Sequence, residues 1–291
     1  MRQTVFIITF ILGSCYSTNS LSQAVKVNAD SSALFANQSN NFIPDYQKTN
    51  FINKEDSPEG FPFLSGDGLR LYFTSNRGNG DRLHFSSRKT INDKFGEPGI
   101  LSKNIKPGFV NGTLTNDELT ICMSYKGQIY LSKRASLHNE FSEPVLIRLK
   151  EQFTSPSISP DGNEIIVMIS GYGSPRILKK VCDFEYAEAG YNPLPGFWGN
   201  DKGQYSKDGL AFYISRANHE RNDTWLYTRK SVKDRFIKTK EFNIQKEGIK
   251  SILNPSINSD GTIVICTINN AEPRYWQQSD LLLFNFQVNR N

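Results

Sequence analysis

Apolar runs alternate with polar turns along most of the chain, and the whole pattern recurs five times. Each unit has an Asp in a short polar turn, followed by a run of β-branched and aromatic residues. The five residues are Asp67, Asp117, Asp161, Asp208 and Asp260, spaced 44 to 52 residues apart. An Asp-Gly pair between two such runs is typical of a tight hairpin, because glycine adopts positive φ and Asp hydrogen-bonds to nearby backbone. Each unit is therefore predicted to contain an antiparallel hairpin.

Further strands are predicted on either side of each hairpin. The run after each turn, such as residues 71–74, is almost continuously apolar, which predicts burial on both faces. A loop and a second apolar run follow, and no helical period interrupts the pattern. A phenylalanine then opens the next strand, at Phe42, Phe95, Phe141, Phe184 and Phe236. Four short strands in a unit of about 48 residues match one blade of a β-propeller.

The two ends of the repeat region predict that the ring closes. The last unit has no fourth strand before the chain ends at Asn291, whereas a spare strand near Phe42 precedes the first unit. Residues near 42–52 are therefore expected to complete the last blade, which removes two sheet edges that would otherwise be free to aggregate. The expected fold is all-β: a β-propeller of five four-stranded blades over residues 42–291.

Three of the repeated segments, residues 61–77, 155–162 and 254–261, resemble the WD40-like repeat family of TolB-type β-propellers. The resemblance covers about residues 55–291 and implies the propeller fold, but it implies no activity because propellers serve many unrelated functions. TolB-like proteins usually have six blades and an extra domain, which this repeat count does not provide. Units two and four depart from the pattern, with Glu118 in place of Gly and Lys207 in place of Pro, so looser turns are expected there.

The amino-terminal residues predict export. Met1 and Arg2 precede a short apolar stretch over residues 4–12, which is too short to span a bilayer. The sequence Leu-Gly-Ser-Cys that ends at Cys15 resembles a bacterial lipobox, in which the Cys becomes the acylated first residue. Residues 1–15 are therefore expected to be a lipoprotein signal, with an ordinary secretory signal and an incidental Cys as the alternative. Residues 16–41 are rich in Ser, Asn, Ala and Gln and are expected to form a flexible tether.

Composition excludes some partners and cofactors from the prediction. The net charge is +5, and the charges are scattered without the Arg/Lys clusters that a nucleic-acid groove requires. Cys122 and Cys266 lie in apolar runs, which indicates buried thiols that behave as small hydrophobes. His84 lies in a strand and is expected to be packed. No Cys or His spacing matches a metal site, so neither a metal nor a cofactor is expected.

Three functions stay open from the sequence. The first is a non-catalytic envelope module that binds a protein, peptide or glycan and is attached to the membrane through a lipid on Cys15. The second is a glycan-active enzyme, which needs paired carboxylates near the axis. The expected inner strands contain no Asp or Glu, and only Glu59 and Asp201 lie at their entrances. The third is a structural subunit of an outer-membrane assembly, and any of the three would be periplasmic, in the outer membrane or on the cell surface.

The predicted ligand site is the propeller face that carries the longer loops. Exposed Trp and Tyr beside Arg and Asn suit the binding of sugars or peptides by stacking and hydrogen bonding. The alternative is that these aromatic residues cap the apolar blade ends. The candidate residues are Arg77, Asp81, Trp198, Arg216, His219, Arg221, Arg274, Tyr275 and Trp276.

Overall fold

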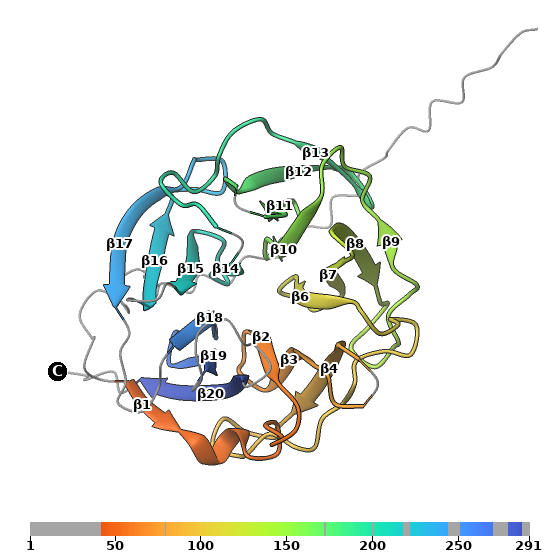
Figure 1. Ribbon diagram of the computed structural model, residues 1–291, viewed down its shortest axis with the longest axis vertical. Helices are drawn as coiled ribbons and strands as arrows, with labels where there is room; N and C mark the ends of the chain where they lie inside the picture. Colours follow the sequence, from red (N-terminus) through yellow and green to blue (C-terminus); the bar gives the residue numbers. More distant parts are fainter. Residues whose placement is uncertain are drawn as a thin grey trace, which may run out of the picture.

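The computed structural model describes residues 42–78, 80–171, 173–199, 201–217, 222–243, 251–269 and 279–286. The expected signal peptide, Cys15 and the expected tether lie outside these residues. The described chain forms five four-stranded antiparallel sheets arranged as the blades of a propeller, and the predicted fold is confirmed (Figure 1).

Each blade runs outward from the axis in sequence order, except the last. Blade one contains β2 (Glu59–Leu64), β3 (Arg70–Ser75), β4 (Arg82–Ser87) and β5 (Gly99–Ile100). Blade two contains β6 (Val110–Leu114), β7 (Thr120–Tyr125), β8 (Gln128–Lys133) and β9 (Val145–Leu146). Blade three contains β10 (Phe153–Ile158), β11 (Glu164–Ile169), β12 (Arg176–Cys182) and β13 (Glu185–Glu188). Blade four contains β14 (Gly203–Tyr205), β15 (Ala211–Ala217), β16 (Asn222–Thr228) and β17 (Ile237–Asn243).

Blade five joins the two ends of the repeat region. It contains β18 (Ser251–Ile257), β19 (Ile263–Asn269) and β20 (Ser279–Phe286), and its outer strand is β1 (Phe42–Asp45). β1 pairs antiparallel with β20, with Phe42 opposite Phe286 and Asp45 opposite Leu283, and a short 3₁₀ helix, η1 (Tyr46–Thr49), follows it. The predicted ring closure is confirmed, and it covers the edge that β20 would otherwise expose.

The Asp-centred turns join the first and second strands of the blades, and those of blades one to four share one hydrogen-bond pattern. In blade one, Ser65 Oγ donates to Asp67 Oδ1 at 2.5 Å, and the amide of Leu69 donates to the same oxygen at 3.0 Å. The expected looser turn in unit two is wrong. Glu118 takes the glycine position with φ of 59°, and its amide donates to Thr115 O at 2.9 Å, as the glycine amide does elsewhere. The turn of unit four, which contains Lys207, also keeps the pattern.

The repeated phenylalanines and basic residues form one structural unit on the same face of the ring. Arg88 Cζ lies 4.6 Å from the ring centroid of Phe95, and Arg88 Nε donates to Gly68 O in the turn at 2.9 Å. Phe95 lies in the connection before β5 rather than opening that strand, and the guanidinium of Arg88 lies over its ring. The same contacts recur with Arg134, Phe141 and Glu118 O in blade two, and with Arg229, Phe236 and Gly209 O in blade four.

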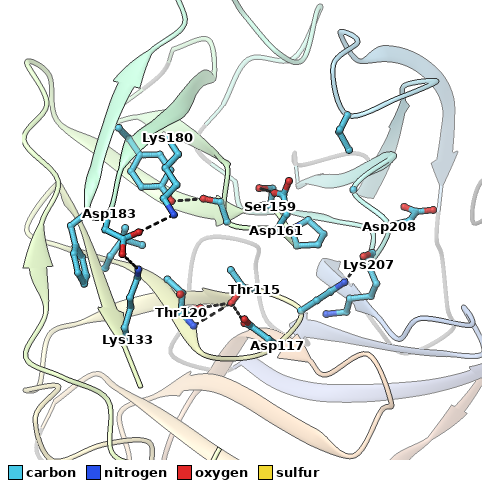
Figure 2. Close-up of a pocket in the computed structure, with 18 of the residues that line it drawn as sticks. Thr115, Asp117, Thr120, Lys133, Ser159, Asp161, Lys180, Asp183, Lys207 and Asp208 are labelled. Carbon is cyan, nitrogen blue, oxygen red and sulfur yellow. Dashed lines mark hydrogen bonds and ion pairs between the residues drawn. The ribbon is translucent and has the colours of Figure 1, made fainter. Parts of the chain in front are cut away.

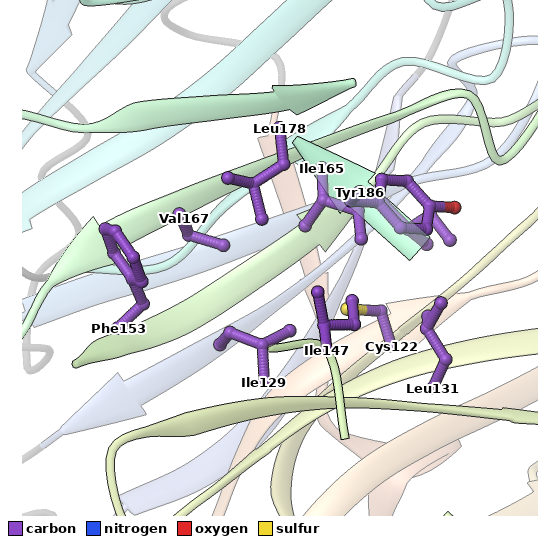
Figure 3. Close-up of a cluster of buried hydrophobic side chains, with 10 residues drawn as sticks. Cys122, Ile129, Leu131, Ile147, Phe153, Ile165, Val167, Leu178 and Tyr186 are labelled. Carbon is purple, nitrogen blue, oxygen red and sulfur yellow. The ribbon is translucent and has the colours of Figure 1, made fainter. Parts of the chain in front are cut away.

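Apolar side chains fill the spaces between neighbouring blades. Between blades two and three, the buried cluster includes Cys122, Leu131, Phe153, Val167 and Tyr186 (Figure 3). Cys122 and Cys266 are both buried, as predicted, and burial raises the pKa of each thiol. His84 is also buried, and desolvation lowers its pKa to about 4. These residues therefore belong to the packed interior.

Candidate functional site

Backbone geometry is unusual in the strands that surround the axis. In four of the five inner strands a β-bulge places a non-glycine residue at positive φ. Positive φ is uncommon for such residues, and it persists only where the surroundings enforce it. The four are Phe61, Asn111, Ser155 and Asn254. Blade four differs, because its inner strand β14 has only three residues and Lys202 precedes it.

Lys202 crosses the axis from blade four to blades one and two. Its Nζ donates to Phe61 O at 3.2 Å and to Gly112 O at 3.0 Å, and its side chain is 0% exposed. Burial lowers the pKa of this ammonium to about 7. Gln204 Nε2 makes a similar crossing to Pro62 O. Inner-strand carbonyls from two other blades are therefore satisfied by side chains of blade four.

A second lysine of blade four reaches blade one on the side of the Asp-centred turns. Lys207 Nζ donates to Leu64 O at 2.6 Å and lies 3.8 Å from the ring centroid of Phe63, both in β2. Burial lowers its pKa to about 7 as well. Lys207 replaces the Pro of the repeat pattern, and the substitution supplies a side chain long enough to reach across the ring.

The one carboxylate among the described inner-strand residues is buried and paired. The structure corrects the expectation that these strands contain no acid, because β2 begins at Glu59. Glu59 is 0% exposed, and its Oε1 accepts from Arg77 Nη2 at 2.8 Å and from Ser75 Oγ at 2.9 Å. Desolvation by burial raises the pKa of Glu59 despite these bonds. The carboxylate is enclosed in the interior and is not presented at an open surface.

The predicted loop-face residues are placed only in part. The Arg77 side chain is 8% exposed and donates to Glu59 and to Ile52 O, so it is committed to the interior. Asp81 is partly buried, which raises its pKa. Trp198 is 58% exposed. Arg216 lies in β15, opposite Asp223 of β16. His219, Arg221, Arg274, Tyr275 and Trp276 lie outside the described residues.

A cavity of about 730 Å³ lies on the opposite face of the propeller (Figure 2). We call this the turn face, because it carries the Asp-centred turns and the connections to the outer strands. The groove runs across the turns of blades two, three and four, and its volume is within the range of ligand sites. Its charged lining residues are Asp117, Lys133, Asp161, Lys180, Asp183, Lys207, Asp208 and Arg229.

An ion triad forms the outer side of the groove. Asp183, in the turn before β13, accepts from Lys133 of blade two and Lys180 of blade three, each at 2.9 Å. These two ammonium groups lower the pKa of Asp183 to about 2. Lys133 Nζ also lies 4.9 Å from the ring centroid of Phe184. The triad therefore joins two blades and carries one surplus positive charge.

Three turn carboxylates lie toward the axis. Asp117, Asp161 and Asp208 are exposed, and each uses Oδ1 to hold its own turn. Asn116 connects the turn of blade two to those of blades three and four. Its backbone N–H donates to Pro160 O at 2.9 Å, and its side-chain Nδ2 donates to Lys207 O at 2.6 Å. The carboxylates are thus held on a rigid frame. The sequence contained them as turn signals, and nothing local indicated that three of them line one groove.

The described residues give no sign of a metal centre or a membrane-spanning helix. No group of three or more His, Cys, Asp and Glu side chains within the described ranges is placed to hold a metal ion. Across that same part of the chain, no helix has the length and apolar character needed to cross a bilayer.

The five four-stranded sheets define this chain as a five-bladed β-propeller, and solved structures share that fold at low identity. An α-L-arabinofuranosidase from Podospora anserina, in complex with cellotriose, matches with a TM-score of 0.57 and 9% identity, over 81% of this chain and 93% of that one. A GH62 hydrolase in complex with xylotriose matches with a TM-score of 0.55 and 8% identity, over 85% and 97%. At these identities the likeness shows the fold alone.

A TolB protein from Agrobacterium tumefaciens matches with a TM-score of 0.44 and 16% identity, over 75% of this chain and 72% of that one. No protein-family model and no curated protein sequence matches the chain.

Proposed function

We propose that this protein is a non-catalytic binding module, a propeller that docks a protein, peptide or glycan. The observation that carries the proposal is the way side chains of the described residues bridge the axis. Two lysines of blade four, Lys202 and Lys207, cross it and bind backbone carbonyls of blades one and two. Glycoside hydrolysis instead needs a pair of carboxylates that flank an open substrate site. Glu59, the described inner-strand carboxylate, is buried against Arg77.

The second candidate is a glycan-active enzyme, which the shared fold with the arabinofuranosidase and the GH62 hydrolase favours. Asp201 is the residue that this candidate would use first, because it is partly exposed beside Lys202 at the entrance to blade four. It would need a second carboxylate near the axis, on the loop face.

One experiment separates the two candidates. The full chain is incubated with arabinoxylan, xylan and a panel of other envelope and plant glycans, and both retention of the glycan and release of reducing sugar are measured. In parallel, intact cells that express the protein are treated with a cross-linker, and the products are identified by mass spectrometry. Retention without release, or a discrete cross-linked partner, supports the binding module. Catalytic release that is lost in Asp201→Asn overturns it in favour of the enzyme.

The proposal includes export and attachment to a membrane through Cys15. The supporting feature is the lipobox-like sequence that ends at this residue. Mass spectrometry of the mature amino-terminal peptide tests it. A diacylated Cys15, lost in Cys15→Ala, is the expected result, and an unmodified peptide that begins at another residue contradicts it.

A further inference from the structure

We propose that the groove on the turn face docks an extended segment of a partner protein, with a basic side chain near the axis and an acidic group at the outer side. This inference rests on the proposed function, because it names the partner class of a binding module. Figure 2 shows the arrangement behind it: the triad of Lys133, Asp183 and Lys180 lies at one side, Asp208 at the other, and Asp117 and Asp161 between them.

The outer side of the groove is suited to a carboxylate. Lys133 and Lys180 share one counter-ion, Asp183, at 2.9 Å each. Each ammonium has three donors, and neither Lys133 nor Lys180 uses all of them on Asp183. Both lysines are about one-third exposed, so an acidic side chain or a chain terminus of a partner can reach them.

The inner side of the groove is suited to a basic side chain. Asp117, Asp161 and Asp208 are exposed at the surface of the groove. The Lys207 ammonium donates to Leu64 O and lies over the ring of Phe63. The second oxygen of Asp117 takes part in no hydrogen bond among the described residues, so it can accept one from an ammonium or guanidinium group.

The charge balance of the groove favours a segment that carries both signs. Its lining has four acidic and four basic side chains. One of the basic ones, Arg229, is already paired with Glu164 at 2.8 Å. A polyanion would meet the turn carboxylates and a polycation would meet the lysine pair, so neither matches the whole groove.

Side-chain chemistry favours a peptide over a glycan. Sugars bind well to an exposed aromatic face, and neither aromatic residue of the groove offers one. The Lys133 ammonium lies over the ring of Phe184, and Tyr186 is buried with its hydroxyl bonded to Gly162 O. The bonds of Asn116 to Pro160 O and Lys207 O hold the three turns together before any ligand arrives, which reduces the entropy lost on binding.

A peptide selection tests the proposal. The full chain is immobilised and used to select from a display library of random short peptides, and selected peptides are synthesised with a fluorophore for anisotropy titrations. We expect the selected peptides to combine a basic residue with an acidic residue several positions away. The double variant Asp117→Asn/Asp161→Asn is expected to weaken their binding at least tenfold.

The matched control is Asp260→Asn. Asp260 holds the blade-five turn through the amide and hydroxyl of Thr262, at 3.0 and 2.6 Å, but does not line the groove. This variant makes the same change of charge in a turn of the same kind outside the groove, so it is expected to leave peptide affinity unchanged. Thermal unfolding of all variants shows whether any loss of affinity comes from a loss of folding.

Charge reversal tests the outer side independently. Lys180→Glu is expected to weaken the selected peptides, and replacing the acidic residue of the peptide with lysine is expected to restore at least part of the affinity. The proposal is overturned if the selected peptides lack this charge pattern or bind equally well to the Asp117→Asn/Asp161→Asn variant. It is also overturned if no peptide is selected while cross-linking still captures a partner, in which case the proposed function stands. If the protein hydrolyses glycans and selects no peptide, both fail.

Discussion

Lys202 gives the sharpest prediction, because an ammonium with no solvent exposure makes stability depend on pH. Its pKa is about 7 in the folded protein, and an unfolded lysine has a pKa of about 10.4. Between these values the unfolded chain holds the proton and the folded chain releases it. Folding stability therefore rises with pH across this window, by about 1.4 kcal/mol per pH unit where the slope is full. From pH 7 to pH 9 the expected gain is about 2 kcal/mol, since the slope is only half-developed at pH 7.

The measurement is urea denaturation at pH 7 and pH 9 of the wild-type chain and of Lys202→Met. The variant has no proton to lose at this position, and contributions from other groups cancel in the difference. The wild type is expected to gain about 2 kcal/mol relative to the variant between the two pH values. Lys202→Gln, which retains a donor for the carbonyls, replaces the Met variant if that one does not fold. Equal pH dependence of wild type and variant would show that the ammonium is solvated and that the axis is open.

Three further predictions concern stability, each checked by urea or thermal denaturation. Glu118→Gln is expected to lower the free energy of unfolding by about 2 kcal/mol. This is less than for a fully buried ion pair, because its partner Arg70 is a quarter exposed. A loss below about 0.5 kcal/mol would contradict the pairing. Phe141→Ala is expected to cost about 3–5 kcal/mol, whereas Leu137→Ala, at an exposed site, is expected to stay within about 0.5 kcal/mol. A chain without residues 1–45 loses β1 and is expected to melt earlier and aggregate compared with a chain without residues 1–41, and equal behaviour of the two would refute the closing role of β1.

The number of blades and the closure of the ring were predictable because their signals are local. Alternating apolar runs and Asp-centred turns depend on contacts between residues a few positions apart, such as Ser65 with Asp67 and Leu69. The missing fourth strand of the last unit and the spare strand at Phe42 then left one simple pairing. The sequence did not predict that Glu118 holds a regular turn at positive φ, because its buried bonds to Arg70 and Tyr72 come from another blade.

The candidate site, in contrast, could not be predicted from local signals. Asp117, Asp161 and Asp208 were visible as turn residues, but their shared groove depends on the curvature that brings three turns to one face. The triad of Lys133, Asp183 and Lys180 joins two blades, and the spacing of these residues in the sequence does not predict it.

The sequence by itself determined the repeating strands and the turns, because each depends on short-range hydrogen bonds and on periodic burial. It also determined the closing strand, because the last unit lacked a fourth strand and only the segment at Phe42 was left to pair with it. Only the tertiary structure decided what occupies the axis. Lys202 donates to Phe61 O, 141 residues away, and Lys207 donates to Leu64 O, 143 residues away. Such contacts depend on the radius of the closed ring and on the short inner strand of blade four, and neither property is encoded by neighbouring residues alone.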